Sequence, residues 1–396
     1  MIKSHITIFF ILTLLSSLAG CENNKNKSIS DAIMSDRPSD QTVGTLSKEE
    51  DNLVTNFTQS DMQSVYSGGI FNPDSFASKI KRGFYANGNH LLVLSNQLHL
   101  YNTETDEIIS SISLEQSEFT VKSFDNGYLT IGFENNELSC NLYDETLQKI
   151  QYVMLSNLIT DYFISPDAIA ISPNGKQIAF AGIKGLYIYD IESESTNTLL
   201  NFESDTAING NRITLINHLA FAADSESIIY AGLGNTIPMI DGEESFSIYG
   251  AISVDGNTKK IIKKDSYEIE SLYVYGDTLV LPQSFEKSDG TLLIADTAVT
   301  RERMIHFNGD REGKDGVFCS SQGEYIATAT LGEGMTIRIY STSNGQLVHT
   351  EFIPDNGEEY FYRVPQVLLL DGSRTCIVLM GQSIDDTETL TTVFEF

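Results

Sequence analysis

The chain has 396 residues, of which 25 are Lys or Arg and 54 are Asp or Glu, so its formal net charge is −29. A polyanion needs a cationic surface to bind, and an acidic excess of this size excludes nucleic acid as a partner and favours cations and basic partners. A net charge so far from zero is also a general device for solubility.

Residues 1–20 have the composition of a targeting segment. Lys3 precedes an apolar run from Ile6 to Leu15, which is too short to span a bilayer as a stable helix. The run leads into Leu18-Ala19-Gly20-Cys21, which resembles the lipobox of bacterial lipoproteins. The resemblance implies that Cys21 carries lipid and that the mature protein is anchored in the cell envelope, on a bacterial membrane and facing outside the cytoplasm. The alternative is an ordinary secretory peptide with an incidental cysteine.

Residues 21–59 comprise the expected lipidated cysteine and a flexible tether. The segment is rich in Asn, Ser, Asp and Lys and has only scattered apolar residues, so it cannot bury enough surface to offset the entropy of ordering. Ser47 followed by Glu50 predicts the start of a short helix that runs to about Phe57. Such a short helix is marginal on its own in water.

Seven corners recur about every 40 to 50 residues along the rest of the chain. Each contains Gly, Asn or Asp, which suit tight turns. A repeat of this length with short strands between corners is typical of a β-propeller. We therefore expect residues 60–396 to form an all-β domain, a seven-bladed β-propeller of four-stranded antiparallel blades. The corners are Asn87-Gly88, Asn126-Gly127, Asn174-Gly175, Asp224-Ser225, Gly276-Asp277, Gln322-Gly323 and Asp371-Gly372.

The third blade shows the pattern most clearly. Ile171 to Gly182 predicts a strand, a turn at Asn174-Gly175 and a second strand, and Leu186 to Asp190 predicts a third. This run resembles the WD repeat and the related YVTN-like blades of bacterial propellers, with Tyr189 in place of tryptophan. The resemblance covers about residues 60–396 at the level of fold and, with the lipobox, implies a bacterial β-propeller lipoprotein. Because the sequence has no Gly-His dipeptide, the hydrogen-bond network of eukaryotic WD repeats is not expected.

The third strands end alike, with an apolar residue, usually a tyrosine, and then a short polar residue. We expect the apolar residue to pack between blades, the next to be an aromatic of the blade and the polar residue to hydrogen-bond its own turn, so these positions serve architecture. The last blade has three convincing strands, and a segment within Met62 to Phe71 is expected to supply the fourth. The endings are Leu100-Tyr101-Asn102, Leu142-Tyr143-Asp144, Ile188-Tyr189-Asp190, Ile294-Ala295-Asp296 and Ile339-Tyr340-Ser341.

The sequence contains no recognisable catalytic, cofactor or metal motif. Serine-hydrolase, zinc-protease and phosphate-loop signatures are missing, and the lack of Trp argues against a quinone-dependent propeller. Residues 308–313 imitate the start of a calcium loop, but Cys319 stands where the loop needs glutamate. The thiols of Cys140, Cys319 and Cys376 lie in apolar runs and are expected to be buried and unpaired. The five histidines after the leader are interpreted as surface or packing residues: His90, His99, His218, His306 and His349.

The candidate binding surface consists of insertions predicted on one face of the propeller. Gly232–Ser245, Gln283–Gly290 and Gly381–Thr389 join second to third strands and are longer than a hairpin requires. A loop between blades adds aromatic rings, which supply contact area while carboxylates orient a basic group. The alternative is that single rings seal the blade junctions. The candidate residues are Asp241, Glu243, Glu244, Glu286, Asp289, Tyr360, Phe361, Tyr362, Asp385 and Asp386.

These observations favour a non-enzymatic protein that binds a protein or peptide, with a basic partner preferred and no cofactor. Two other functions stay open. One is a propeller enzyme of the lactonase-like or lyase-like kind, with acids near the central channel binding a metal or acting as general base. The other is an accessory scaffold in envelope assembly or transport.

The lipid anchor gives a direct prediction. Replacing Cys21 with Ser removes the thiol that lipidation requires, and with it acyl chains that contribute about 0.8 kcal/mol per buried methylene. We expect fractionation of cells to find Cys21→Ser in the soluble fraction and the parent protein with the membranes. Retention of the serine protein on membranes would contradict lipidation.

Overall fold

A computed structural model describes the part of the chain that contains the repeats. The described residues are 71, 76, 80–114, 117–135, 137–157, 165–202, 211–236, 246–264, 269–283, 291–306, 316–332, 334–354, 365–381 and 389–396. All of them belong to one of the chain's two compact units, Gln59–Phe396. The leader, Cys21, the tether with its expected helix and residues 308–313 lie outside the described residues. Within the described part, no helix has the length and hydropathy needed to cross a bilayer.

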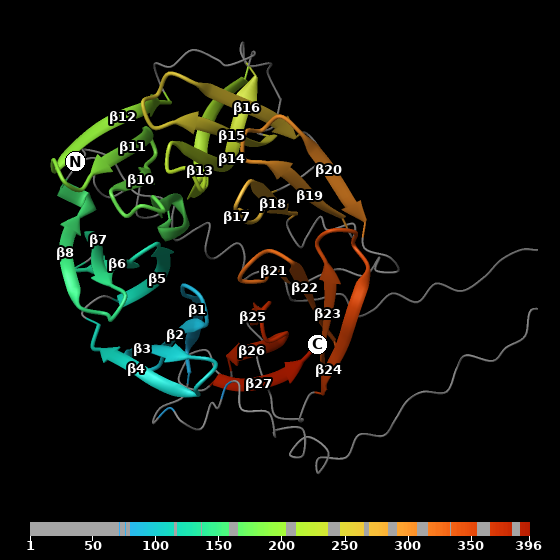
Figure 1. Cartoon of the computed structure of the whole chain (residues 1–396). Coiled ribbons are helices and arrows are strands. Elements are labelled where there is room, and N and C mark those ends of the chain that lie inside the picture. Colours follow the sequence, from blue (N-terminus) through green and yellow to red (C-terminus); the bar gives the residue numbers. More distant parts are fainter. Residues whose placement is uncertain are drawn as a thin grey trace, which may run out of the picture. The chain divides into compact units, whose positions relative to one another are not determined.

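The described strands form seven antiparallel sheets around a common axis, which confirms the expected seven-bladed β-propeller (Figure 1). Six sheets have four strands, and neighbouring strands in each sheet are neighbours in the chain. The first strand of each sheet lies nearest the axis and the last lies at the outer rim (Figure 1).

The strand bounds follow the predicted repeats. Blades 1 to 4 are β1 (Arg82–Tyr85), β2 (His90–Leu94), β3 (Leu98–Asn102) and β4 (Glu107–Ile112); β5 (Ser117–Phe124), β6 (Gly127–Glu134), β7 (Glu137–Asp144) and β8 (Lys149–Met154); β9 (Ile169–Ile171), β10 (Gln177–Ala181), β11 (Gly185–Asp190) and β12 (Ser195–Asn201); and β13 (Asn211–Phe221), β14 (Ser227–Thr236), β15 (Phe246–Ser253) and β16 (Lys259–Lys264). Blades 5 to 7 are β17 (Tyr273–Tyr275), β18 (Thr278–Pro282), β19 (Thr291–Asp296) and β20 (Glu302–His306); β21 (Gly316–Cys319), β22 (Tyr325–Leu331), β23 (Gly334–Ser341) and β24 (Leu347–Pro354); and β25 (Gln366–Leu370), β26 (Thr375–Gly381) and β27 (Thr389–Glu395). Two short 3₁₀ turns, η2 (Leu155–Asn157) and η3 (Pro166–Ala168), lie between blades 2 and 3.

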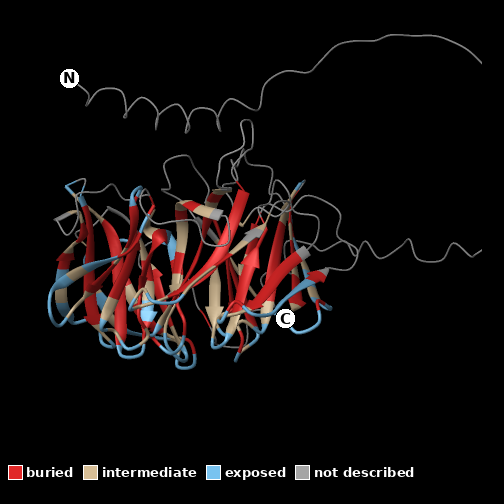
Figure 2. Ribbon diagram, turned by 90° about the horizontal axis from the view of Figure 1, so that it is seen from above, coloured by how far each residue is buried: buried red, intermediate tan, exposed pale blue. Residues whose placement is uncertain are grey.

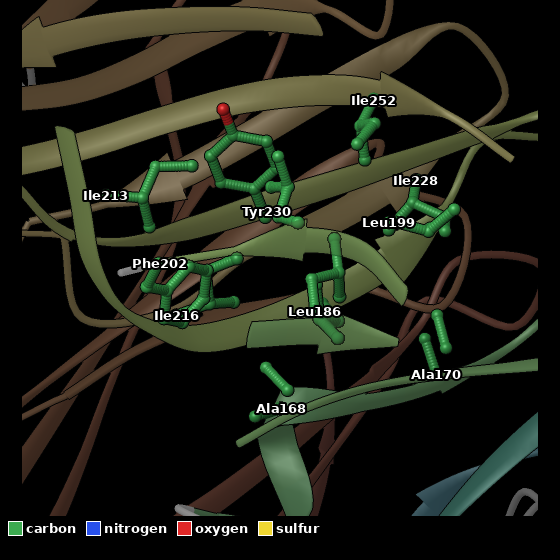
Figure 3. Packing of buried hydrophobic residues seen from close by; sticks show 14 of the residues in the cluster. Ala168, Ala170, Leu186, Leu199, Phe202, Ile213, Ile216, Ile228, Tyr230 and Ile252 are labelled. Carbon is green, nitrogen blue, oxygen red and sulfur yellow. The ribbon is translucent and has the colours of Figure 1, made fainter. Parts of the chain in front are cut away.

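The hydrophobic core of this propeller lies between the blades. Successive residues of a strand point to opposite faces of its sheet. In β10, Ile178 and Phe180 pack against blade 2, whereas Ala179 and Ala181 pack against blade 4. Seven apolar clusters result, one for each pair of neighbouring blades. Figure 3 shows the cluster between blades 3 and 4, and Figure 2 shows that the strands that form such clusters are largely buried.

The third-strand endings are architectural, as predicted. In blade 1, Leu100 packs against blade 2 and Tyr101 packs against blade 7. In blade 3, Ile188 packs against blade 4 and Tyr189 packs against blade 2. The polar residue that follows holds its own turn: Asp144 Oδ1 accepts hydrogen bonds of 2.9 Å from the backbone N–H groups of Thr146 and Gln148. The tyrosines of this series are all buried: Tyr101, Tyr143, Tyr189 and Tyr340.

One corner glycine meets two separate requirements. Gly323 has φ +75°, and a Cβ atom there would lie 2.5 Å from the ring of Tyr275 in the neighbouring blade. A side chain would therefore be strained by the backbone and would also collide with blade 5. The glycine of this corner is therefore required both by the geometry of its turn and by the contact between blades 5 and 6.

The ring is closed between blades 7 and 1. The backbone N–H of Gly83 donates to Gln366 Oε1 at 3.0 Å, and Gln366 Nε2 donates to the carbonyl of Gly83 at 2.6 Å. Phe71 and Phe76 join the apolar cluster of these two blades. Blade 7 has three described strands, and residues 62–70 of the expected closing strand lie outside the described residues.

The expected blade-four insertion begins later than the sequence predicted. Gly232 to Thr236 continue β14, where they pair with β13, and Gly232 to Gly234 also pair with β15. A Cβ atom at Gly232 would lie 2.0 Å from the carbonyl oxygen of Leu215, so glycine here allows a close approach of two backbones. Gly232 therefore permits a contact between two strands and does not begin a loop. The segment that joins β14 to β15 is residues 237–245.

The packing at the blade 7–blade 1 junction gives a stability prediction. Phe76 is 6% exposed, and its ring centroid lies 5.6 Å from that of Tyr101. We expect Phe76→Ala to lower the free energy of unfolding by about 3–5 kcal/mol, because it removes a buried ring and leaves a cavity. Urea unfolding followed by circular dichroism measures this change.

The matched control is Phe352→Ala, because Phe352 on β24 is 55% exposed. It should change the unfolding free energy by less than about 0.5 kcal/mol. Equal effects of the two changes would show that Phe76 does not help to close the ring.

Candidate functional site

The ten residues predicted for the binding surface all lie outside the described residues. They fall in segments 237–245, 284–290, 355–364 and 382–388, and they are Asp241, Glu243, Glu244, Glu286, Asp289, Tyr360, Phe361, Tyr362, Asp385 and Asp386.

The structure does describe the strand ends that flank these segments. Strands within a blade alternate in direction, so connections between second and third strands, and those between blades, begin and end on the same side of the ring. We call this side the loop face and define it by strand ends such as Thr236, Phe246, Gly381 and Thr389. The opposite side, which carries the corners and the third-to-fourth-strand turns, is the turn face.

The turn face is exposed and acidic, and its aspartates hold the turns together. Asp190 Oδ1 accepts hydrogen bonds from the backbone N–H of Ser193 at 2.8 Å and from the Ser193 hydroxyl at 2.7 Å. Hydrogen bonds of this kind lower the pKa of Asp144, Asp190 and Asp255 below the usual value. These carboxylates are therefore part of the turn structure, and acidity alone does not distinguish the loop face from the turn face.

A tyrosine from blade 1 reaches across the inner ends of two other blades. The Tyr85 hydroxyl donates to the carbonyl of Cys319 in blade 6 at 2.7 Å and accepts from the backbone N–H of Leu369 in blade 7 at 2.9 Å. Burial raises the pKa of Tyr85 well above its usual value, so the hydroxyl stays protonated. Tyr85 thus ties the first strands of three blades together near the axis.

The described thiols offer no reactive group. Cys140, Cys319 and Cys376 are unpaired and buried, as predicted. Burial raises the pKa of each thiol above its usual value, which keeps the thiolate population low at neutral pH.

Three polar residues from successive blades lie on elements that pack together at the inner edge of the ring. Lys122 lies on β5 of blade 2, Asp167 on η3 at the entrance to blade 3, and His218 on β13 of blade 4. Lys122 Nζ lies 3.9 Å from Asp167 Oδ1, and the strand that carries His218 packs against η3. We call these residues the axial triad. Its two charged side chains remain open to solvent, with 33% of Lys122 and 58% of Asp167 exposed.

Local structure fixes the position of Asp167. The Ser165 hydroxyl accepts a hydrogen bond from the backbone N–H of Asp167 at 3.1 Å, and Pro166 occupies the first turn of η3. Serine at the N-cap and proline at the next position are both favoured at a helix start. The short turn packs beside β5 and β13, the strands that carry Lys122 and His218.

A β-bulge precedes His218. Ile216 pairs with Gly232 and His218 with Ala231, so Asn217 is an extra residue on β13. A bulge breaks the strict alternation of side chains and re-aims the residue that follows. Thr214 marks a second bulge in the same strand. The 11-residue β13 is therefore the most irregular of the described first strands, and its bulge at Asn217 adjoins His218.

Burial sets the protonation of the histidine. It lowers the pKa of His218 below its usual value, the Asp167 carboxylate acts in the opposite direction, and the Lys122 ammonium adds to the lowering. The imidazole is consequently neutral at neutral pH, and the triad there consists of one cation, one anion and one neutral ring.

Sequence reasoning missed the axial triad. His218 was expected to be a surface or packing residue, and Lys122 and Asp167 belong to no motif. The sequence contains only indirect signs of this site. Ser165-Pro166-Asp167 has the pattern of a capped turn, and His218 lies three residues before the end of a first strand.

The fold places this chain among the seven-bladed β-propeller proteins. No known protein-family model matches the sequence. Over 181 residues the chain is 23% identical to the adipocyte plasma membrane-associated protein of Rattus norvegicus, a match that covers 42% of this chain and 46% of that protein. The match thus spans less than half of the relative's length.

Two solved structures share the fold. The β-propeller domain of Cps50 (Swd1) from Myceliophteria thermophila has a TM-score of 0.52 and 13% identity, and the match covers 80% of this chain and 99% of that domain. KlHsv2 with loop 6CD replaced by a Gly-Ser linker has a TM-score of 0.50 and 11% identity, and the match covers 81% of this chain and 98% of that structure. At these identities the likeness shows the fold alone.

The lowered pKa of His218 gives a prediction for stability against pH. Below the usual histidine pKa of 6.5, the unfolded chain binds a proton at this site that the folded protein does not bind until a lower pH. The free energy of unfolding should therefore fall as pH decreases from 7 toward the lowered value. Urea unfolding at several pH values between 5 and 8 measures the slope, and His218→Gln should reduce it.

His99, whose pKa is also lowered by burial, provides the comparison. His99→Gln should reduce the slope independently, and the double variant should reduce it further than either single change. A slope in His218→Gln equal to that of the parent protein would show that His218 titrates alike in the folded and unfolded states.

Proposed function

We propose that this protein is a membrane-anchored, extracytoplasmic β-propeller lipoprotein that binds a protein or peptide through its loop face and catalyses no reaction. One observation carries the proposal. The strand ends that flank the long connections of blades 4, 5 and 7 all lie on the same side of the ring. The acidic residues of those connections are therefore attached to one face of a rigid scaffold.

The rigidity of the scaffold supports this role. Each blade is held by an apolar cluster on both of its faces. Burying a large apolar side chain contributes about 1.5–3 kcal/mol, so a ring with many such residues keeps its strand ends in fixed positions. Binding residues are found disproportionately on loops that such scaffolds position.

The described aspartates of the turn face are committed to its turns. On the turn face, aspartates such as Asp144, Asp190 and Asp255 accept hydrogen bonds from their own turns. The sequence of the loop-face connections combines acids with the run Tyr360-Phe361-Tyr362. Acids beside aromatic rings suit a basic partner, because rings bury contact area and cations interact with both groups.

The anchor fixes where binding occurs. The lipobox-like sequence at Cys21 and the polar segment after it would hold the propeller at a short distance from a membrane. The distant relative from Rattus norvegicus is named as a plasma membrane-associated protein, which is in keeping with this location.

The test is crosslinking in intact cells followed by affinity capture of the tethered protein. The key variant carries Asp241→Asn, Glu243→Gln and Glu244→Gln, which removes three acids from one loop-face connection. We expect this variant to recover at least several-fold less of the partner, because it loses the charges that attract a basic surface. A second variant, in which connections 237–245 and 382–388 are cut to tight turns, should lose the partner.

The matched control neutralises three exposed acids on the turn face, Glu145→Gln, Glu192→Gln and Glu226→Gln. It makes the same change in net charge and should recover the partner as well as the parent protein does. Equal recovery by all variants would rule out the loop face as the binding surface.

A further inference from the structure

The axial triad brings a cation and an anion close together without joining them by a hydrogen bond. The 3.9 Å between Lys122 Nζ and Asp167 Oδ1 exceeds the usual 2.7–3.2 Å of a hydrogen bond, so the two groups attract each other without direct contact. Both side chains are partly exposed to solvent. A ligand can therefore reach a positive group and a negative group at one place.

Each member of the triad is held by regular structure. Lys122 projects from β5, where it pairs with Leu129, and Asp167 is fixed by the capped turn η3. His218 is positioned by the bulge in β13. Backbone positions that strands and capped turns hold are preorganised, which is a condition for a binding site.

The spacing selects ligands that carry opposite charges on neighbouring atoms. A carboxylate accepts from the Lys122 ammonium, and an ammonium on the adjacent carbon donates to the Asp167 carboxylate. These contacts are charge-assisted and stronger than those between neutral groups. His218 lies on the strand that packs against η3, and its neutral ring leaves the charge of the site unchanged.

The net charge of the protein further restricts which ligands the site can bind. With a formal net charge of −29, the protein repels simple anions at long range. At short range, Asp167 repels simple anions and Lys122 repels simple cations. A zwitterion has no net charge and meets neither penalty.

We propose that the axial triad of Lys122, Asp167 and His218 is a binding site for a small zwitterion of the α-amino acid type. The carboxylate of the ligand lies against Lys122 and its ammonium against Asp167. This site is separate from the loop-face surface proposed for a protein partner, because its residues lie on the first elements of blades 2, 3 and 4.

Calorimetric titration of the purified full-length protein with glycine, L-alanine, L-serine and L-glutamine tests the proposal. We expect at least one of them to bind, and Lys122→Met and Asp167→Asn each to weaken that binding by at least about tenfold, the equivalent of one charge-assisted hydrogen bond. The matched control is Lys176→Met, which removes an exposed lysine from the corner of blade 3 and should bind as the parent protein does.

Two derivatives of L-alanine separate the charges of the ligand. L-alaninamide lacks the carboxylate and N-acetyl-L-alanine lacks the ammonium, and each should bind at least about tenfold more weakly than alanine. Equal binding of alanine and N-acetylalanine would make the site a carboxylate site and overturn the proposal.

Other results would overturn it as well. These are the lack of binding of all four amino acids at millimolar concentration, and unchanged binding by Lys122→Met. Thermal unfolding of each variant shows that a loss of binding is not a loss of fold. Capture of the protein partner should be the same in Lys122→Met as in the parent protein, so this proposal and the proposed function can fail separately.

Discussion

The packing of each blade against both of its neighbours is the interaction on which the rest of the structure depends. An isolated four-stranded sheet of this chain would expose an apolar surface on both sides, and only a closed ring buries all seven pairs of faces. Small residues permit the close approach, as at Ala179 and Ala181 between blades 3 and 4 and at Gly323 under the Tyr275 ring. Closure therefore requires contacts between residues far apart in sequence, such as Gly83 with Gln366.

This constraint separates scaffold from site. Residues that face a neighbouring blade, such as Tyr101 and Tyr340, and residues that hold a turn, such as Asp144 and Asp190, are committed to the ring. Residues at the ends of strands on the loop face and at the inner edges of the first strands are less constrained. Function is accordingly expected where the repeat is irregular, and β13, with two bulges in one strand, is the clearest irregular element in the described part.

The two proposed sites differ in physical character. The loop face would offer breadth, acidity and aromatic surface to a macromolecule, and its contacts would be sensitive to salt because they depend on exposed charges. The axial triad would offer three groups at fixed positions to a small molecule, and its selectivity would come from opposite charges 3.9 Å apart. A propeller can carry both kinds of site, because one lies on connections that join strands and the other on the strands and turns that form the inner edge of the ring.

The sequence by itself determined the number of blades, most strand positions and the role of the tyrosine series, because these follow from local spacing and from the alternation of side chains along a strand. The prediction that was wrong also concerned a local feature. Gly232 was interpreted as the start of a loop, although it allows two strands to approach each other. Only the tertiary structure decided that Lys122, Asp167 and His218 lie on elements that pack together, since they are about 50 residues apart in sequence and belong to three different repeats. Closing the ring brings the first elements of those repeats together around one axis, and a repeat pattern, which describes each blade separately, does not show which residues of different blades share that axis.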